Sequence, residues 1–132
     1  MLYLNKQQRH ELVGHADNAL PEEACGIIAG KGERVDRIYP MTNTDKSART
    51  FFMNSEEQLK VMKDIRNSGI VMIGIYHSHP QTEAYPSAHD VELAYYPEAS
   101  YVIISLRDRN NPDVRSFKII EGKITEEKVV VQ

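Results

Sequence analysis

The sequence predicts a mixed α/β fold in which helices flank a central β-sheet. One reason is that segments with apolar residues three and four positions apart, typical of helices, alternate with short apolar runs typical of strands. A second reason is their order, which runs helix, strands, helix, strand, helix, strands. The chain has 132 residues, which suits one domain over residues 1–132 with a core that needs no disulfides.

The first expected element is a helix that Asn5 caps and that runs to about Ala19. Pro21 marks its end, because proline cannot continue a helix. Apolar residues recur at intervals of three and four and give the helix one apolar face. They are Leu12, Val13, Ala16 and Leu20.

Two strands are expected next, over residues 23–29 and 34–39, with glycine-rich sequence between them. We expect the second strand to stop at Pro40. The polar stretch 41–50 indicates a loop, and residues 50–53 indicate a short strand.

Ser55, followed by Gln58, has the spacing of a capping box and predicts a second helix that ends before Gly69. Residues at helical spacing are expected to form its buried face. They are Leu59, Met62 and Ile65.

Residues 70–76 are continuously apolar, which is typical of a central strand covered on both faces. A loop over 80–86 follows. Ser87 then opens a short helix that Pro97 ends.

The last three expected elements are strands. Residues 101–106 form a buried strand, and residues 114–120 and 123–131 form a closing hairpin across Glu121-Gly122.

Composition excludes several classes of protein. The formal net charge is −3, so the chain lacks the broad basic surface of a nucleic-acid binder. A single cysteine, Cys25, excludes a disulfide scaffold. No apolar run is long enough to span a bilayer, and residues 1–8 show no signal peptide pattern. We therefore expect a cytoplasmic protein with no membrane or nucleic-acid partner.

The most informative segment is His77-Ser78-His79-Pro80, with Asp90 further on. Two histidines two apart on a strand point to the same side, and Pro80 favours an extended backbone at His79. Two imidazoles and a carboxylate are three ligands of a catalytic zinc, with water as the fourth. The His-Glu-x-x-His motif of other metalloproteases is absent, and one cysteine excludes a deaminase Cys-x-x-Cys.

A structural reading of the same residues stays open at this point. Exposed His-x-His pairs are common, and Ser87 with Asp90 has the spacing of an ordinary capping box. The spacing alone does not choose between a metal site and these alternatives.

The whole pattern resembles something more specific. Glu23 lies upstream in Pro21-x-Glu23-x-Cys25-Gly26, followed by His77-Ser78-His79-Pro80 and Ser87-x-x-Asp90. This resembles the JAMM motif of the MPN+ (JAB1/MPN/Mov34) zinc metallopeptidases, complete and in order. The resemblance implies the cytidine-deaminase-like MPN/JAB1 fold, with a mostly antiparallel central sheet flanked by helices.

The resemblance also implies a role for each motif residue. His77, His79 and Asp90 would hold one Zn²⁺ per chain. Glu23 would take a proton from the attacking water and return it to the leaving amine. Ser87 would donate a hydrogen bond to the oxyanion.

Other polar residues near the motif are expected to lie outside the site. Glu22 would be an exposed charge, because it faces away from Glu23 in an extended chain. Cys25 would be a buried apolar residue. His89 lies about 100° around the helix from Asp90. His10 and His15 are expected to be solvated.

The implied activity is cleavage of the amide bond after the C-terminal Gly-Gly of a ubiquitin-like protein. Only 53 residues separate Glu23 from His77, which leaves little room for the insertions of eukaryotic deubiquitinating members. The chain is therefore similar to the short prokaryotic members that act on sulfur-carrier proteins and release an amino acid such as cysteine or a conjugated protein.

Two other functions stay open. One is a metallopeptidase that acts on another amide, such as a cell-wall peptide, and the other is a non-catalytic MPN scaffold. The complete motif argues against the scaffold. The exposed hairpin or the first helix could support a homodimer, and the loop 81–86 could close over substrate.

Overall fold

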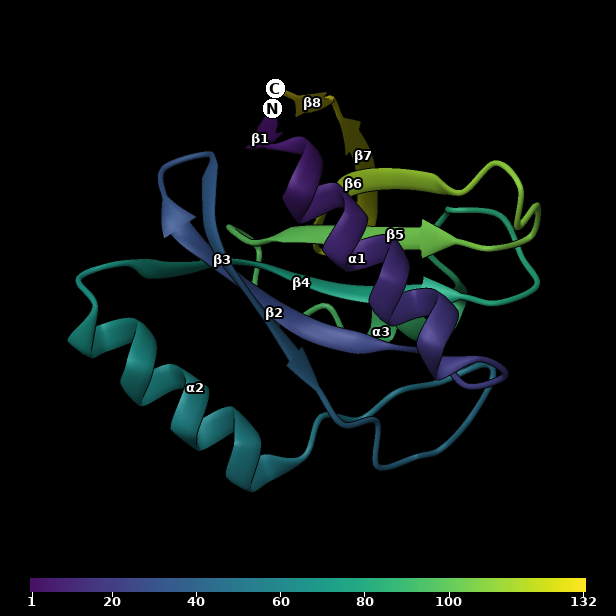
Figure 1. Ribbon diagram of the computed structural model, residues 1–132, viewed down its shortest axis with the longest axis horizontal. Helices are drawn as coiled ribbons and strands as arrows, with labels where there is room; N and C mark the ends of the chain where they lie inside the picture. Colours follow the sequence, from purple (N-terminus) through teal and green to yellow (C-terminus); the bar gives the residue numbers. More distant parts are fainter.

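An eight-stranded sheet forms the centre of the computed structural model, which describes residues 1–132 (Figure 1). The strands lie in the order β7-β6-β5-β4-β2-β3-β1-β8. Four of the seven neighbouring pairs are antiparallel, so the sheet is mostly antiparallel as expected. The strands are β1 Leu2–Leu4, β2 Cys25–Lys31, β3 Arg34–Met41, β4 Val71–His79, β5 Ser100–Ser105, β6 Asp113–Ile120, β7 Lys123–Glu127 and β8 Val129–Val131.

Three helices flank the sheet: α1 Lys6–Ala19, α2 Ser55–Asn67 and α3 Ala88–Glu92. Asn5 caps α1 in a full capping box with Gln8. The cap of α2 is Asn54, one residue before the expected Ser55, because the Asn54 side chain accepts the Glu57 N–H.

The two faces of the sheet carry different helices. Leu12 and Ala16 of α1 pack with Tyr76 and Val102 on one face, and Figure 1 shows α1 crossing β4 and β5 there. On the other face, Ile65 of α2 packs against β2, and the residues around α3 pack against β5 and β6. The later part of β4 is buried between these layers, as predicted for a central strand, whereas Val71 at its start is exposed.

The strands differ from the prediction at three places. β2 begins at Cys25, so Glu23 lies before the strand. β3 continues through Pro40, which pairs with Gly26, because beyond Arg34 no strand lies on its other side and the missing N–H removes no bond. Residues 50–53 form no strand, since Asn43 binds the Phe52 N–H through its side chain and only an isolated bridge to Met53 forms.

The buried face of the second helix and the end of the third were also predicted wrongly. On α2 only Ile65 is buried, whereas Leu59 is 59% exposed and Met62 is 36% exposed. The helix is turned so that Val61 and Ile65 face the sheet. α3 ends at Glu92, well before Pro97, and leaves Tyr95 exposed in the following loop.

The single strand predicted over residues 123–131 is two strands, and these lie at opposite edges of the sheet. Glu121 and Gly122 both have positive φ and form the expected hairpin turn. β7 then pairs with β6, and after Lys128 the chain continues as β8, which pairs in parallel with β1. The two edge strands of the sheet, β7 and β8, are therefore joined through Lys128, so the sheet curves to bring its edges together.

No helix combines the length and the apolar character required to cross a membrane.

Candidate metal centre

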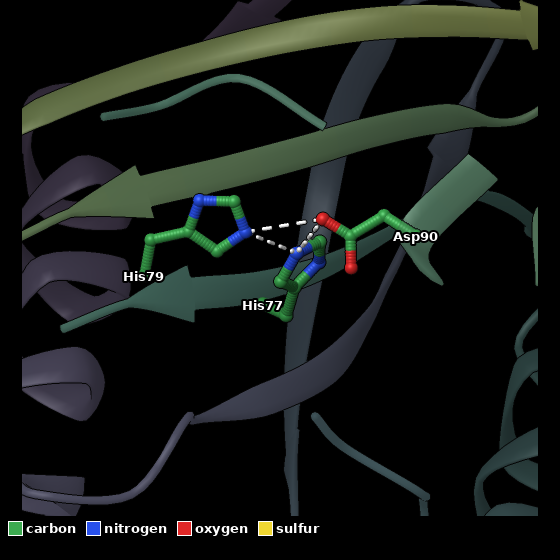
Figure 2. A group of neighbouring side chains, drawn as sticks. All are labelled: His77, His79 and Asp90. Atoms are coloured by element: carbon green, nitrogen blue, oxygen red, sulfur yellow. Dashed lines mark hydrogen bonds and ion pairs between the residues drawn. The ribbon is translucent and has the colours of Figure 1, made fainter. Parts of the chain in front are cut away.

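Three ligand-type side chains converge at the carboxyl end of β4 (Figure 2). His77 and His79 project from the same side of β4, and Asp90 comes from the first turn of α3. The Nε2 atoms of the two histidines are 3.1 Å apart, and each lies 3.1 Å from Asp90 Oδ2. All three residues are buried. The expected convergence of these side chains is therefore present.

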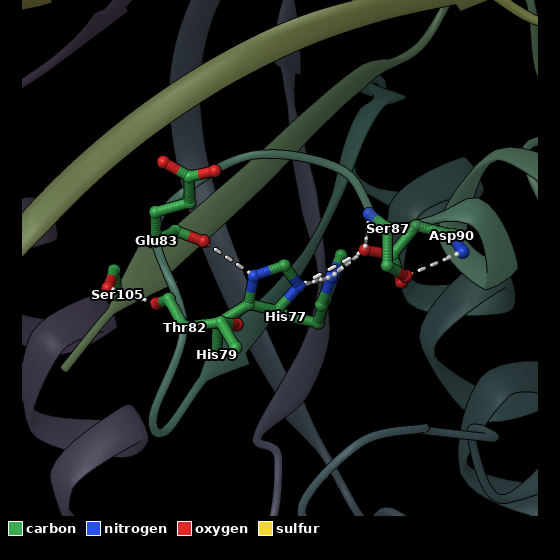
Figure 3. Close-up of polar contacts among 7 residues, drawn as sticks. All are labelled: His77, His79, Thr82, Glu83, Ser87, Asp90 and Ser105. Atoms are coloured by element: carbon green, nitrogen blue, oxygen red, sulfur yellow. Dashed lines mark hydrogen bonds and ion pairs between the residues drawn. The ribbon is translucent and has the colours of Figure 1, made fainter. Parts of the chain in front are cut away.

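The tautomer of His79 follows from its other ring nitrogen. Nδ1 lies 2.8 Å from the backbone carbonyl oxygen of Glu83, which only accepts hydrogen bonds (Figure 3). Nδ1 therefore carries a hydrogen, and in the neutral ring Nε2 presents a lone pair toward His77 and Asp90. A carbonyl that orients a histidine in this way is typical of metal-ligating histidines.

His77 is held by packing. The ring of Phe51 stacks on the ring of His77, with centroids 4.8 Å apart and planes at 23°. His77 Nδ1 is buried without a hydrogen-bond partner in the protein. Phe51 comes from the loop between β3 and α2 and covers one face of the imidazole.

Asp90 is fixed by the start of α3. Its Oδ2 accepts the Ser87 N–H at 2.9 Å, and the Ser87 Oγ accepts the Asp90 N–H at 3.1 Å. This capping box, expected from the spacing, orients the carboxylate toward the histidines. Ser87 Oγ keeps its own proton free to donate, and the residue is exposed.

The charges follow from burial and from the contacts within the group. Burial lowers the pKa of His77, and Asp90 offsets this only in part. Burial also lowers the pKa of His79, but hydrogen bonds to Asp90 and Glu83 raise it more. Burial opposes ionisation of Asp90, yet its contacts with the two imidazoles keep its pKa well below the usual range. The group therefore combines the Asp90 carboxylate with a neutral His77 and with a His79 whose contacts favour its protonated form in the protein alone.

These donors fit a zinc ion. Bonds of 2.0–2.1 Å to a tetrahedral ion place neighbouring ligands about 3.3 Å apart, which is close to the separations found here. Without a cation, the three atoms can be held together only by imidazole hydrogens placed among them, whereas a cation satisfies all three lone pairs at once. Two imidazoles and one carboxylate with a fourth position open are a donor set that suits catalytic zinc.

Glu23 lies beside this group and is 3% exposed. Its Oε1 has no hydrogen-bond partner in the protein, and burial raises its pKa to about 8. Its backbone is held by loop 42–54, because its N–H donates to the Ser47 carbonyl and its carbonyl accepts the Asn43 amide. A carboxyl group with this pKa can exchange a proton near neutral pH.

Two of the neighbouring polar residues differ from expectation. Glu22, expected to be exposed, is half-buried. His89 is exposed and outside the group, and Cys25 is buried in the α2 core, both as expected. Burial raises the pKa of the Cys25 thiol to about 12. The expectation that His15 is solvated is wrong, because it is half-buried and its Nδ1 lies 2.6 Å from the Tyr76 hydroxyl on the opposite face of the sheet.

The sequence did not point to Phe51 or Asn43. The Asn43 side chain donates to the carbonyls of Glu23 and Thr50 and accepts the N–H groups of Asp45 and Phe52. It thus holds loop 42–54 against the site. Neither residue belongs to a motif. The only indication in the sequence was the polar character of the stretch 41–50, which predicted a loop.

A family model described as prokaryotic homologs of the JAB domain matches residues 5–120. The CysO-cysteine peptidase of Mycobacterium tuberculosis is 45% identical over 122 residues, which are 91% of this chain and 84% of that protein. The probable TtuB-protein conjugate cleaving protease of Thermus thermophilus is 32% identical over 124 residues, which are 93% of this chain and 79% of that protein.

Solved structures share the fold. A solution structure of a Desulfitobacterium hafniense protein is similar with a TM-score of 0.91 and 44% identity, covering 100% of this chain and 93% of that one. A JAB1/MPN domain protein from Archaeoglobus fulgidus has a TM-score of 0.65 at 19% identity, covering 98% of this chain and 99% of that one. The last likeness concerns the fold alone.

Proposed function

The chain belongs to the family of prokaryotic homologs of the JAB domain, and on this premise we propose that it is a zinc-dependent peptidase of ubiquitin-like or sulfur-carrier conjugates. It hydrolyses the amide bond after the C-terminal Gly-Gly of the carrier protein. The observation that carries the proposal is the convergence of His77, His79 and Asp90 beside the buried carboxyl of Glu23.

We propose the same roles that the motif implies. His77, His79 and Asp90 hold the ion, which when bound makes a water molecule more acidic and polarises the scissile carbonyl. Glu23 accepts the proton of the attacking water and delivers it to the leaving amine from its buried position beside the ligands. Ser87 Oγ donates a hydrogen bond to the oxyanion and at the same time caps α3 by accepting the Asp90 N–H.

The names of the relatives support the class of substrate. One is named for a CysO-cysteine bond and another for conjugates of TtuB with proteins. Both names describe a conjugate of a small carrier protein, although the carrier and the leaving group differ between the two relatives.

Three further statements are part of the proposal. Residues 1–132 act as one domain. The protein works in the cytoplasm, where a free thiol such as Cys25 persists. The carrier protein is its partner. A homodimer formed through α1 or the β6–β7 hairpin is tested by light scattering on the purified protein.

The first experiment is zinc content by mass spectrometry. We expect about one zinc per chain in the wild type, a loss in His79→Ala, and no change in His89→Ala, whose side chain lies outside the group. A protein that takes up no zinc at neutral pH, or a His79→Ala variant that keeps it, contradicts the metal centre.

The second experiment offers the zinc-loaded protein two kinds of carrier conjugate, one with cysteine and one with a lysine-linked protein. Cleavage of either after Gly-Gly supports the proposal. Cleavage of cell-wall peptides alone supports a metallopeptidase of another amide, and binding of partners without any cleavage supports a scaffold.

A further inference from the structure

Ser105, the last residue of β5, is hydrogen-bonded to the loop that follows His79. It lies beside His79 in the parallel pairing of β4 with β5 and is 4% exposed. Its Oγ donates to the Thr82 carbonyl at 2.6 Å (Figure 3) and accepts the Arg107 N–H at 3.2 Å. Because a carbonyl oxygen only accepts, the proton of this hydroxyl is directed at the loop.

The next carbonyl of the loop contacts the metal centre. The Glu83 carbonyl accepts the His79 Nδ1–H at 2.8 Å, and the same oxygen accepts the Tyr85 N–H at 2.9 Å. Thr82 directly precedes Glu83, so two successive carbonyls of one short segment bind different partners (Figure 3). The position of the second carbonyl therefore depends on how the first is held.

Little else holds the first half of this loop. Two hydrogen bonds join the backbone of residues 81–86 to the rest of the protein, and these are the bonds from Ser105 and His79. The second half is also held by packing, since Ala84 is buried, whereas residues 81–83 are exposed. The Ser105 hydroxyl is therefore the one hydrogen-bonding anchor of the exposed half outside the metal centre.

The loop also has room to move if it is released. A cavity of about 480 Å³ lies against it, bordered by Glu83, Ala84, Ser105 and Arg107. The lining of this cavity is almost entirely polar or charged, so no apolar packing holds the loop from that side. A displaced loop would carry the Glu83 carbonyl away from His79.

We propose that Ser105 is a positioning residue of the metal centre. Its hydroxyl holds loop 81–86 so that the Glu83 carbonyl keeps the His79 ring turned toward the other two ligands. The inference rests on the proposed function, of which it requires the metal centre alone. Ser105 lies outside the motif that carries the metal ligands.

His79 depends on such support more than the other two ligands do. The ring of His77 is stacked against Phe51, and the Asp90 carboxylate is fixed by the capping box of α3. The ring of His79 is oriented by its hydrogen bond to a loop carbonyl. Partners of this kind typically contribute roughly 10- to 100-fold to metal affinity, so loosening the Glu83 carbonyl weakens the site.

The test compares the zinc affinity of the wild type and Ser105→Ala by competition with a chromogenic chelator. We expect affinity to fall roughly 3- to 10-fold, because the Glu83 carbonyl is loosened but not removed. Ser105→Thr keeps the hydroxyl and should restore wild-type affinity. Ser105→Cys has a weaker donor of similar shape and should bind zinc less tightly than the wild type, which keeps the test valid if Ser105→Ala does not fold.

A matched control separates positioning from stability. Ser116→Ala removes another buried hydroxyl, which donates to Glu127 at 2.7 Å and lies outside the ligand group. This variant should have a lower melting temperature but wild-type zinc affinity, because the lost hydrogen bond holds no part of the metal centre.

A spectroscopic measurement reports on the geometry of the ligands. Cobalt(II) bound in the place of zinc absorbs visible light with an intensity that depends on its coordination geometry. We expect the cobalt spectrum of Ser105→Ala to differ from that of the wild type. The spectra of Ser105→Thr and Ser116→Ala should match the wild type.

The outcomes separate this inference from the proposed function. If the wild type binds no zinc, the proposed function fails together with its metal centre. If the wild type binds zinc and the affinities follow the expected order, but no carrier conjugate is cleaved, the substrate of the proposed function fails and the positioning role stands.

Two results would overturn the positioning role itself. One is a Ser105→Ala variant with wild-type zinc affinity and an unchanged cobalt spectrum, which would leave the hydroxyl only its contact with the Arg107 N–H. The other is an equal fall in affinity in Ser105→Ala and Ser116→Ala, which would assign the effect to stability.

Discussion

Ser78, between the two histidines on β4, is hydrogen-bonded twice to Ala24, the residue that follows Glu23. The Ser78 Oγ accepts the Ala24 N–H at 2.8 Å, and the Ser78 N–H donates to the Ala24 carbonyl at 3.0 Å. Ser78 is fully buried and faces away from the ligands. Its hydroxyl therefore fixes the backbone that carries Glu23 relative to the strand that carries His77 and His79.

Ser78→Ala tests this coupling. The Ala24 N–H would be left buried without a partner, which costs about 1–3 kcal/mol of stability, and Glu23 would lose its fixed position. We expect kcat to fall roughly 10- to 100-fold, with KM and zinc content unchanged. Ser78→Thr keeps the hydroxyl and should restore kcat. A Ser78→Ala variant with wild-type kcat would show that the hydroxyl serves the fold alone.

Glu23→Gln should abolish turnover while keeping the fold. Glutamine has the shape of the protonated carboxyl, which is the form that burial favours, so melting temperature and zinc content should hardly change. Loss of the proton carrier should lower kcat roughly 10²- to 10⁴-fold. Glu22→Gln is the matched control and should retain activity. If Glu23→Gln had the same kcat as Glu22→Gln, Glu23 would take no part in the reaction.

Phe51→Ala should weaken zinc binding. The variant loses the stacking partner of His77 and frees the ring to turn, so we expect affinity to fall roughly 3- to 10-fold. Competition with a chromogenic chelator measures this. Tyr85→Ala removes an aromatic ring that packs on Phe117 instead and should leave zinc affinity unchanged. Unchanged affinity in Phe51→Ala would mean that the strand alone holds His77.

Glu127 makes stability depend on pH. Burial raises its pKa, but the hydroxyls of Ser100 and Ser116, which donate to its carboxylate at 2.6 and 2.7 Å, lower it more, so the net pKa lies below 4.5. Its contribution to stability is therefore present above pH 4.5 and is lost as pH falls through the lowered pKa.

Glu127→Gln should consequently lower the free energy of unfolding at pH 7 by about 1 kcal/mol, because the amide oxygen still accepts the hydroxyls of Ser100 and Ser116 but no longer as a charged acceptor. The difference from wild type should shrink as the solution is acidified below the usual glutamate range. Denaturant titrations at several pH values measure it, with the exposed Glu126→Gln as control. A difference that does not vary with pH would exclude the ionised carboxylate as its source.

The meeting of the metal ligands could be predicted from sequence because it depends on local geometry. Alternation along a strand places His77 and His79 on one side, and the capping box of Ser87 and Asp90 orients the carboxylate. The position of Glu23 could not be obtained in this way. It depends on loop 42–54 and on Ser78, which join segments far apart in the sequence, and only the family resemblance singled it out.

The parts of the fold that were missed also depend on distant contacts. The spacing of Leu59, Met62 and Ile65 describes an apolar face of α2, but it does not say how far that helix is turned toward the sheet. β1 has only three residues, too few for a periodic pattern. It is a strand because β3 and β8 pair with it on either side.

The pairing of β1 with β8 has a consequence for how the protein is made. Leu2 pairs with Val129, so the first strand to leave the ribosome acquires this neighbour only after nearly all of the chain has been synthesised. The loop that closes is almost the longest that the chain allows, and such distant contacts slow folding. Until residues 129–131 emerge, the backbone donors and acceptors on that side of Leu2–Leu4 have only water to bind, and a nascent chain stalled before this point carries an open sheet edge.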